Sequence, residues 1–113
     1  MLIVEDERPL AHALELKFTH EGYEVTIATD GEEALRIANV TKFDIILLDL
    51  IMPNLDGFAF MEQLKKKSPI LVLSNLGQEE DKERAKGLGA VGYYVKSNTP
   101  ITDIIKTVKS ITK

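Results

Sequence analysis

Apolar residues recur along the chain with two periods, one typical of buried strands and the other of helices. Residues 2–4 and 70–73 are unbroken apolar runs, and so is the end of residues 43–48. Such runs are expected of strands that helices cover on both faces of a parallel sheet. Residues 23–27 instead alternate apolar and polar side chains, which predicts a strand at the edge of the sheet. Residues 91–95 complete a set of five predicted strands.

Each predicted strand is followed by a segment with apolar residues at helical spacing. Pro fits the first turn of a helix, and Asp and Thr are common N-caps. The five helices are expected to begin near Pro9, Asp30, Asp56, Gln78 and Thr99. We expect the third helix to close in Lys65-Lys66-Lys67, because cations favour the negative end of a helix dipole.

The fourth predicted helix, residues 78–87, has the smallest apolar face of the five. It is strongly charged, and Ala85 and Leu88 are its main apolar positions. A helix that buries little apolar surface opens easily. We therefore expect low local stability in this part of the chain.

The alternation of strand and helix predicts a doubly wound α/β domain with a five-stranded parallel sheet. Residues 1–113 contain no linker or repeat, so we expect a single domain. The three apolar strands belong in the middle of the sheet and the alternating strand at its edge. The flavodoxin-like (βα)5 order 2-1-3-4-5 places them so, and its ligand crevice lies between strands 1 and 3.

Composition excludes several kinds of chemistry. The chain has no Cys and two His, which rules out thiolate chemistry and makes a zinc site improbable. A net charge of -4 argues against direct nucleic acid binding, because no basic surplus is present to neutralise phosphates. No apolar run approaches the roughly 20 residues that span a bilayer, and the N-terminus lacks the basic start of a signal peptide. These features predict a cytoplasmic protein that does not enter a membrane.

Chemically active side chains follow four of the predicted strands. Glu5-Asp6 follows the first, Asp49 the third, Ser74 the fourth and Lys96 the fifth. The carboxyl ends of parallel strands share one edge of a sheet, so these residues should meet there. Three carboxylates at one place need a counter-charge, and a hard divalent cation such as Mg²⁺ supplies it through oxygen ligands. An Asp beside Mg²⁺, a lysine and a hydroxyl has what an acyl-phosphate nucleophile requires. Taken singly, the acids after the first strand and Lys96 more often belong to solvated surface, and Ser74 to a turn or cap. Their joint placement at one sheet edge is much less expected by chance.

Four motifs of the chain resemble those of the receiver domains of two-component response regulators, including the chemotaxis receivers. They lie at residues 2–7, 44–57, 73–74 and 92–96, and the resemblance covers the whole chain. It implies a phosphorylatable signalling switch that catalyses only its own phosphoryl transfer and dephosphorylation and is not otherwise an enzyme.

The resemblance also implies roles for the acidic residues. Asp49 would accept a phosphoryl group from a histidine kinase or phosphotransfer protein. Asp6 and Asp49 would bind Mg²⁺ directly, with the backbone carbonyl of Ile51 as a third ligand. Glu5 would act through a water molecule.

The remaining implied roles concern the switch and its output. Ser74 and Lys96 would contact the phosphoryl group, and Tyr93 would be the aromatic side chain that rotates. The surface of helix 4, strand 5 and helix 5 would change and control a downstream protein or output domain, with a phosphorylation-dependent dimer as one form of output.

The chain departs from the family pattern on either side of this predicted site. Ser97 stands where the family usually has Pro after its Lys, and we expect a trans Lys96-Ser97 bond with a rearranged loop through Asn98. Asn75 stands where the family usually has a small residue, so it would crowd the phosphoryl group or form a hydrogen bond to it.

Ile51 and Leu76 occupy the positions that tune dephosphorylation in the resembled family. Neither side chain has a polar atom to orient the attacking water, which predicts a long-lived phosphorylated state. Asn75 could oppose this effect, because its amide could itself hold a water molecule.

Two other functions remain open at this point. One is a docking module of the same fold that takes no phosphate, and the intact acidic set with Ser74 and Lys96 argues against it. The other is a Mg²⁺-dependent phosphohydrolase, in which a second Asp would stand at position 51, now Ile51. The sequence does not identify the kinase or the output, nor whether the domain acts alone.

Overall fold

The computed structural model describes all 113 residues and contains a five-stranded parallel sheet. The strands are β1 (Leu2–Val4), β2 (Thr26–Ala28), β3 (Ile46–Leu48), β4 (Ile70–Ser74) and β5 (Gly92–Val95). Their order in the sheet is β2-β1-β3-β4-β5. The predicted fold and strand order are therefore confirmed.

Five α-helices connect and follow the strands. They are α1 (Arg8–His20), α2 (Gly31–Val40), α3 (Gly57–Gln63), α4 (Glu79–Gly87) and α5 (Ile101–Thr112). A short 3-10 helix, η1 (Lys96–Asn98), links β5 to α5. None of these helices is long and apolar enough to cross a lipid bilayer.

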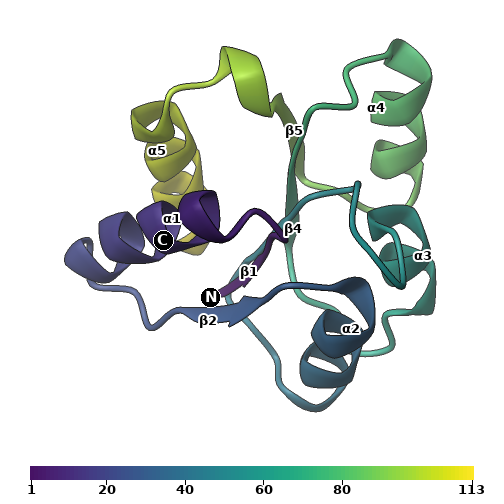
Figure 1. The fold of residues 1–113 in the computed structure, drawn as a ribbon, viewed down its shortest axis with the longest axis horizontal. Helices are drawn as coiled ribbons and strands as arrows, with labels where there is room; N and C mark the ends of the chain where they lie inside the picture. The colour runs from purple at the N-terminus through teal and green to yellow at the C-terminus, as the bar shows by residue number, and fades with distance from the viewer.

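The helices form two layers around the sheet (Figure 1). On one side, Phe18 of α1 and Val108 of α5 pack with Ile3 of β1 in one core. On the other, α2, α3 and α4 pack in a second core that includes Val4. Neighbouring residues of a strand point to opposite faces, so each apolar strand supplies both cores.

The middle strands are buried and the edge strand β2 is partly exposed, as predicted. Every residue of β1, β3 and β4 is buried. Strand β2 is shorter than the predicted strand at residues 23–27 and begins further along the chain, because its pairing with β1 begins at Leu2 and Thr26. Tyr23 and Val25 lie before it but still pack against the core of α1 and α5.

Side-chain caps fix the starts of α2 and α3. Asp30 accepts a hydrogen bond from the Glu33 N–H at 2.9 Å, and Asp56 accepts one from the Ala59 N–H at 2.9 Å. The predicted Thr99 cap is wrong. Its hydroxyl donates to the Val95 carbonyl at 2.8 Å, so it is engaged by the preceding turn while α5 begins after Pro100.

The predicted end of the third helix is also wrong. Helix α3 ends at Gln63, and Leu64 has an extended backbone. The Lys65 N–H donates to the Asn39 side-chain carbonyl at 2.7 Å, which replaces a helical hydrogen bond with one to α2. The three lysines therefore lie beyond the helix and do not cap its dipole.

Candidate functional site

The predicted residues meet at the carboxyl ends of β1, β3 and β5. Asp6, Asp49 and Lys96 border a pocket of about 170 Å³, which Glu7, Ile51 and Asn75 also line. Glu5 and Ser74 are buried at the ends of β1 and β4 and are not among the lining residues. Residues far apart in sequence reach it because all five strands are parallel and so end on one edge of the sheet.

Asp49 follows β3 directly and is only 4% exposed. Its Oδ1 accepts a hydrogen bond from the Ile51 N–H at 3.1 Å. Its Oδ2 accepts one from the Lys96 ammonium at 2.8 Å. The two bonds fix the orientation of the carboxylate before any ligand binds.

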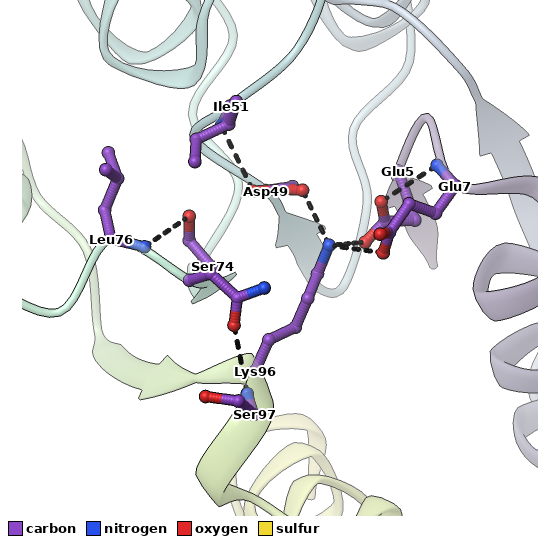
Figure 2. A network of polar contacts seen from close by, with 9 residues as sticks. Glu5, Glu7, Asp49, Ile51, Ser74, Leu76, Lys96 and Ser97 are labelled. Carbon is purple, nitrogen blue, oxygen red and sulfur yellow. Dashed lines mark hydrogen bonds and ion pairs between the residues drawn. The ribbon is translucent and has the colours of Figure 1, made fainter.

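Lys96 lies between Asp49 and two glutamates (Figure 2). Its Nζ is 2.8 Å from a Glu5 oxygen and 3.0 Å from a Glu7 oxygen. Burial lowers the pKa of Lys96, but the hydrogen bonds to Asp49, Glu5 and Glu7 outweigh it, so the net shift of the pKa is upward. The ammonium therefore stays charged and serves as the counter-charge of the site.

Glu7 is a contact that sequence reasoning missed. In the sequence it is only the third acid after the first strand, and nothing local indicates that it pairs with a lysine 89 residues later. It also precedes the first residue of α1. The structure thus adds Glu7 to Glu5 and Asp49 as a third carboxylate partner of Lys96.

The acidic cluster has the donor set of a divalent cation site. Oxygen atoms of Glu5, Asp6 and Asp49 lie within 4.8 Å of one another. Burial raises the pKa of Glu5 to about 7, against the lowering effect of its hydrogen bond to Lys96. Lys96 balances only part of this negative charge, and hard oxygen ligands suit Mg²⁺, so the residues present fit that ion.

Ser74 and Tyr93 are joined through the backbone of Leu76. Ser74 is fully buried at the end of β4, and its hydroxyl accepts from the Leu76 N–H at 3.4 Å. The Tyr93 hydroxyl donates to the Leu76 carbonyl. Burial raises the pKa of Tyr93, which keeps this hydroxyl protonated as a donor.

The three residues expected to tune dephosphorylation lie in different surroundings. Ile51 is 53% exposed, and both it and Asn75 border the pocket. The Leu76 side chain instead packs against the core of α2, α3 and α4 and is not among the lining residues. The side-chain carbonyl oxygen of Asn75 accepts a hydrogen bond from the Ser97 N–H at 3.0 Å.

The loop after Lys96 has the predicted backbone. The chain contains no cis peptide bond, so the Lys96-Ser97 bond is trans. Residues Lys96–Asn98 form the single turn η1, and the predicted trans bond is confirmed.

Known proteins of one family match this chain along most of its length. The sequence profile of the response regulator receiver domain covers residues 1–109. A probable transcriptional regulator, ycf27 of Cyanophora paradoxa, is 40% identical over 102 residues, which are 88% of this chain and 43% of that protein. The chain thus spans less than half the length of this relative.

Solved structures agree with the sequence match. The receiver domain of the Francisella response regulator 1452 has a TM-score of 0.90 at 30% identity, over 98% of this chain and 93% of that one. The receiver domain of the sensor histidine kinase PA1611 of Pseudomonas aeruginosa, solved with a magnesium ion coordinated in its active site cleft, has a TM-score of 0.85 at 26% identity. That match covers 98% of this chain and 94% of that one. The chain therefore belongs to the receiver domains of two-component response regulators, signalling domains whose general function is that of a phosphorylatable switch.

Proposed function

We propose that residues 1–113 act as one signalling domain in which Asp49 accepts a phosphoryl group from a histidine kinase or phosphotransfer protein. The observation that carries this proposal is the Asp49 carboxylate itself. It is almost fully buried, faces a pocket, and is held by the Ile51 N–H and the Lys96 ammonium. Glu5 is also buried at the end of a central strand and held on both oxygens, by the Glu7 N–H and the Lys96 ammonium, but of the two only Asp49 lines the pocket.

In the proposed transfer, an oxygen of Asp49 forms a bond to phosphorus. The bond from phosphorus to the donor imidazole breaks, and its electron pair returns to the imidazole nitrogen. Lys96 would follow the negative charge from the carboxylate onto a phosphoryl oxygen, which its flexible stem allows. The Ile51 N–H would keep the spectator carboxylate oxygen in place.

Mg²⁺ is the proposed cofactor. Asp6, Asp49 and the Ile51 backbone carbonyl would bind it directly, and Glu5 through a water molecule. When bound, the ion neutralises charge on the phosphoryl oxygens. The magnesium ion in the cleft of the similar PA1611 receiver domain supports this assignment.

Phosphorylation would be read out through Ser74 and Tyr93. A Ser74 hydroxyl that turns to the phosphoryl group would release the Leu76 N–H, and Tyr93 would follow the moving Leu76 carbonyl. The surface of α4, β5 and α5 would then change. It would act on a downstream protein or output domain, with dimerisation through this surface as one form of output and no direct contact of this domain with nucleic acid.

Intact-mass measurement after incubation with Mg²⁺ and acetyl phosphate tests the acceptor assignment. The wild-type protein should gain the mass of one phosphoryl group, and Asp49→Asn should gain none. Asp44→Asn is a matched control, because Asp44 is an exposed carboxylate near the opposite end of the same strand. Equal labelling of wild type and Asp49→Asn, or no labelling of wild type, would contradict the proposal.

A further inference from the structure

A hydrogen bond links the loop after β4 to the turn after β5. The Ser97 N–H donates to the Asn75 side-chain carbonyl at 3.0 Å. The two residues are the positions where the sequence departs from the family pattern. A Pro at position 97 would have no N–H, and an Ala at position 75 would have no side-chain acceptor, so this bond requires both departures.

The link lies one step beyond the end of the sheet. The last paired residues of β4 and β5 are Ser74 and Val95. Lys96 follows immediately, and its backbone is held by no further strand pairing. The bond from Asn75 to Ser97 therefore ties the residue after Lys96 to the residue after Ser74.

Little packing replaces this bond if it is lost. Asn75 and Lys96 border both the acidic pocket and a second, more apolar hollow of about 250 Å³ on the side of α1 and α5. Asn75 and Ser97 are exposed, and the hydrogen bond from the Thr99 hydroxyl to the Val95 carbonyl closes the turn η1 without joining it to β4. Without the link, the backbone of Lys96 has room to shift toward the second hollow.

A small shift of that backbone matters because the ammonium has competing partners. Lys96 Nζ is 2.8 Å from both Asp49 and Glu5, and 3.0 Å from Glu7. Glu7 is exposed, so a displaced lysine would keep that partner and lose the two buried ones, Glu5 and Asp49. The position of the Lys96 backbone thus determines which carboxylates the ammonium contacts.

We propose that Asn75 is a positioning residue that holds Lys96 on Asp49 through the N–H of Ser97. This inference rests on the proposed role of Asp49 as the phosphoryl acceptor. Loss of a single neutral hydrogen bond changes an equilibrium by roughly 2- to 10-fold. Breaking the link should therefore slow phosphorylation of Asp49 by about that factor.

Four variants separate the link from other effects of these side chains. Asn75→Ala removes the acceptor, and Ser97→Pro removes the donor. Ser97→Ala is the matched control, because it changes the side chain and keeps the N–H. The double variant Asn75→Ala/Ser97→Pro should be no slower than either single variant that breaks the link, because partners in one interaction are not additive.

Two measurements on these proteins test the inference. Hydrogen exchange of the Ser97 amide should be protected in wild type and faster in Asn75→Ala. The rate of phosphorylation by acetyl phosphate should fall in Asn75→Ala and Ser97→Pro and stay unchanged in Ser97→Ala. Mg²⁺ affinity should not weaken in Asn75→Ala, because Lys96 is not a proposed ligand, whereas a general disturbance of the acidic cluster would weaken it.

The inference fails if Ser97 exchange is the same in wild type and Asn75→Ala. It also fails if the double variant shows the product of the two single effects, or if Ser97→Ala is as slow as Ser97→Pro. A wild-type protein that takes up no phosphoryl group would refute the proposed function instead, and the exchange measurement would still report on the link.

Discussion

At the scale of single residues, Lys96 supplies the positive charge that offsets the buried carboxylates, and the stability of the fold depends on it. Its ammonium is the shared partner of Glu5, Glu7 and Asp49. Removing one partner of a buried ion pair leaves an uncompensated charge and typically destabilises a protein by about 3–5 kcal/mol.

Lys96→Gln should therefore lower the free energy of unfolding. Adding Mg²⁺ should raise the free energy of unfolding more in Lys96→Gln than in wild type. Urea unfolding with and without Mg²⁺ measures both effects. Lys109→Gln is the matched control, because Lys109 pairs with Glu21 on the surface, where ion pairs contribute little. Equal unfolding midpoints for Lys96→Gln and Lys109→Gln would show that Lys96 does not compensate the cluster.

The lifetime of the phosphorylated state is a second prediction at this scale. Ile51 borders the pocket and offers no side-chain polar atom to a water, and a water-orienting group typically contributes about 10²–10⁴-fold. We expect wild-type phospho-Asp49 to decay over minutes to hours. The double variant Ile51→Asn/Leu76→Glu should decay faster, with most of the acceleration already present in Ile51→Asn.

Decay in excess Mg²⁺ after removal of the phosphodonor provides the measurement. Ile51→Val is the control, because it keeps an apolar side chain at the rim of the pocket. Loss within seconds in wild type, or no acceleration in the double variant, would show that these side chains do not set the lifetime.

At the scale of elements, Gly57 lets α3 begin directly beside the strand end that carries Asp49. A Cβ at position 57 would lie 2.7 Å from the Leu50 Cα and 2.8 Å from the Asp49 carbonyl oxygen, so backbone atoms would have to move. Gly57→Ala should destabilise the fold by about 1–3 kcal/mol, as overpacking does, and should slow phosphorylation.

Gly87→Ala supplies the contrast, because a Cβ there meets nothing within 4 Å. Ala is the better helix former, so this change at the end of α4 should be neutral or slightly stabilising. Denaturant unfolding of both variants provides the measurement. A Gly57→Ala protein as stable as wild type would contradict the close approach.

Helix α4 should be the least stable helix of the domain. Ala85 is its one buried residue. The guanidinium carbon of Arg84 lies 4.1 Å from the centroid of the Phe58 ring and so links α4 to α3. We expect its amides to exchange with solvent faster than those of α1 or α3, because local opening exposes little apolar surface. Exchange as slow as global unfolding would rule out α4 as an easily displaced element.

Local patterns in the sequence predict these elements better than they predict contacts between them. The strand order and the caps Asp30 and Asp56 follow from apolar runs and from residues within one helical turn. The early end of α3 does not, because the Lys65 N–H bonds to Asn39, 26 residues away. The Lys96–Glu7 pair and the Asn75–Ser97 link likewise join distant segments, and no local pattern indicates them.

At the scale of the whole molecule, the loop between β4 and α4 connects the site to the proposed output surface. One end of this loop is Ser74, and its Leu76 carbonyl accepts the Tyr93 hydroxyl from β5. In the proposed switch, a movement of Ser74 would reach Leu76 and Tyr93 through two hydrogen bonds, without disturbing the buried middle of the sheet. This short route fits a switch whose core stays fixed while one face changes.

Asp49 is the residue proposed to carry the phosphoryl group. Borohydride reduction of the protein after treatment with acetyl phosphate and Mg²⁺ tests this assignment most directly, because an acyl phosphate is reduced to an alcohol and Asp becomes homoserine. Fragment mass spectra should place homoserine at position 49 and at no other carboxylate. Homoserine at Asp6 or another Asp in place of position 49, a glutamate reduced to 5-hydroxynorvaline at Glu5, or no reduced residue in a protein that has gained the phosphoryl mass would contradict this assignment.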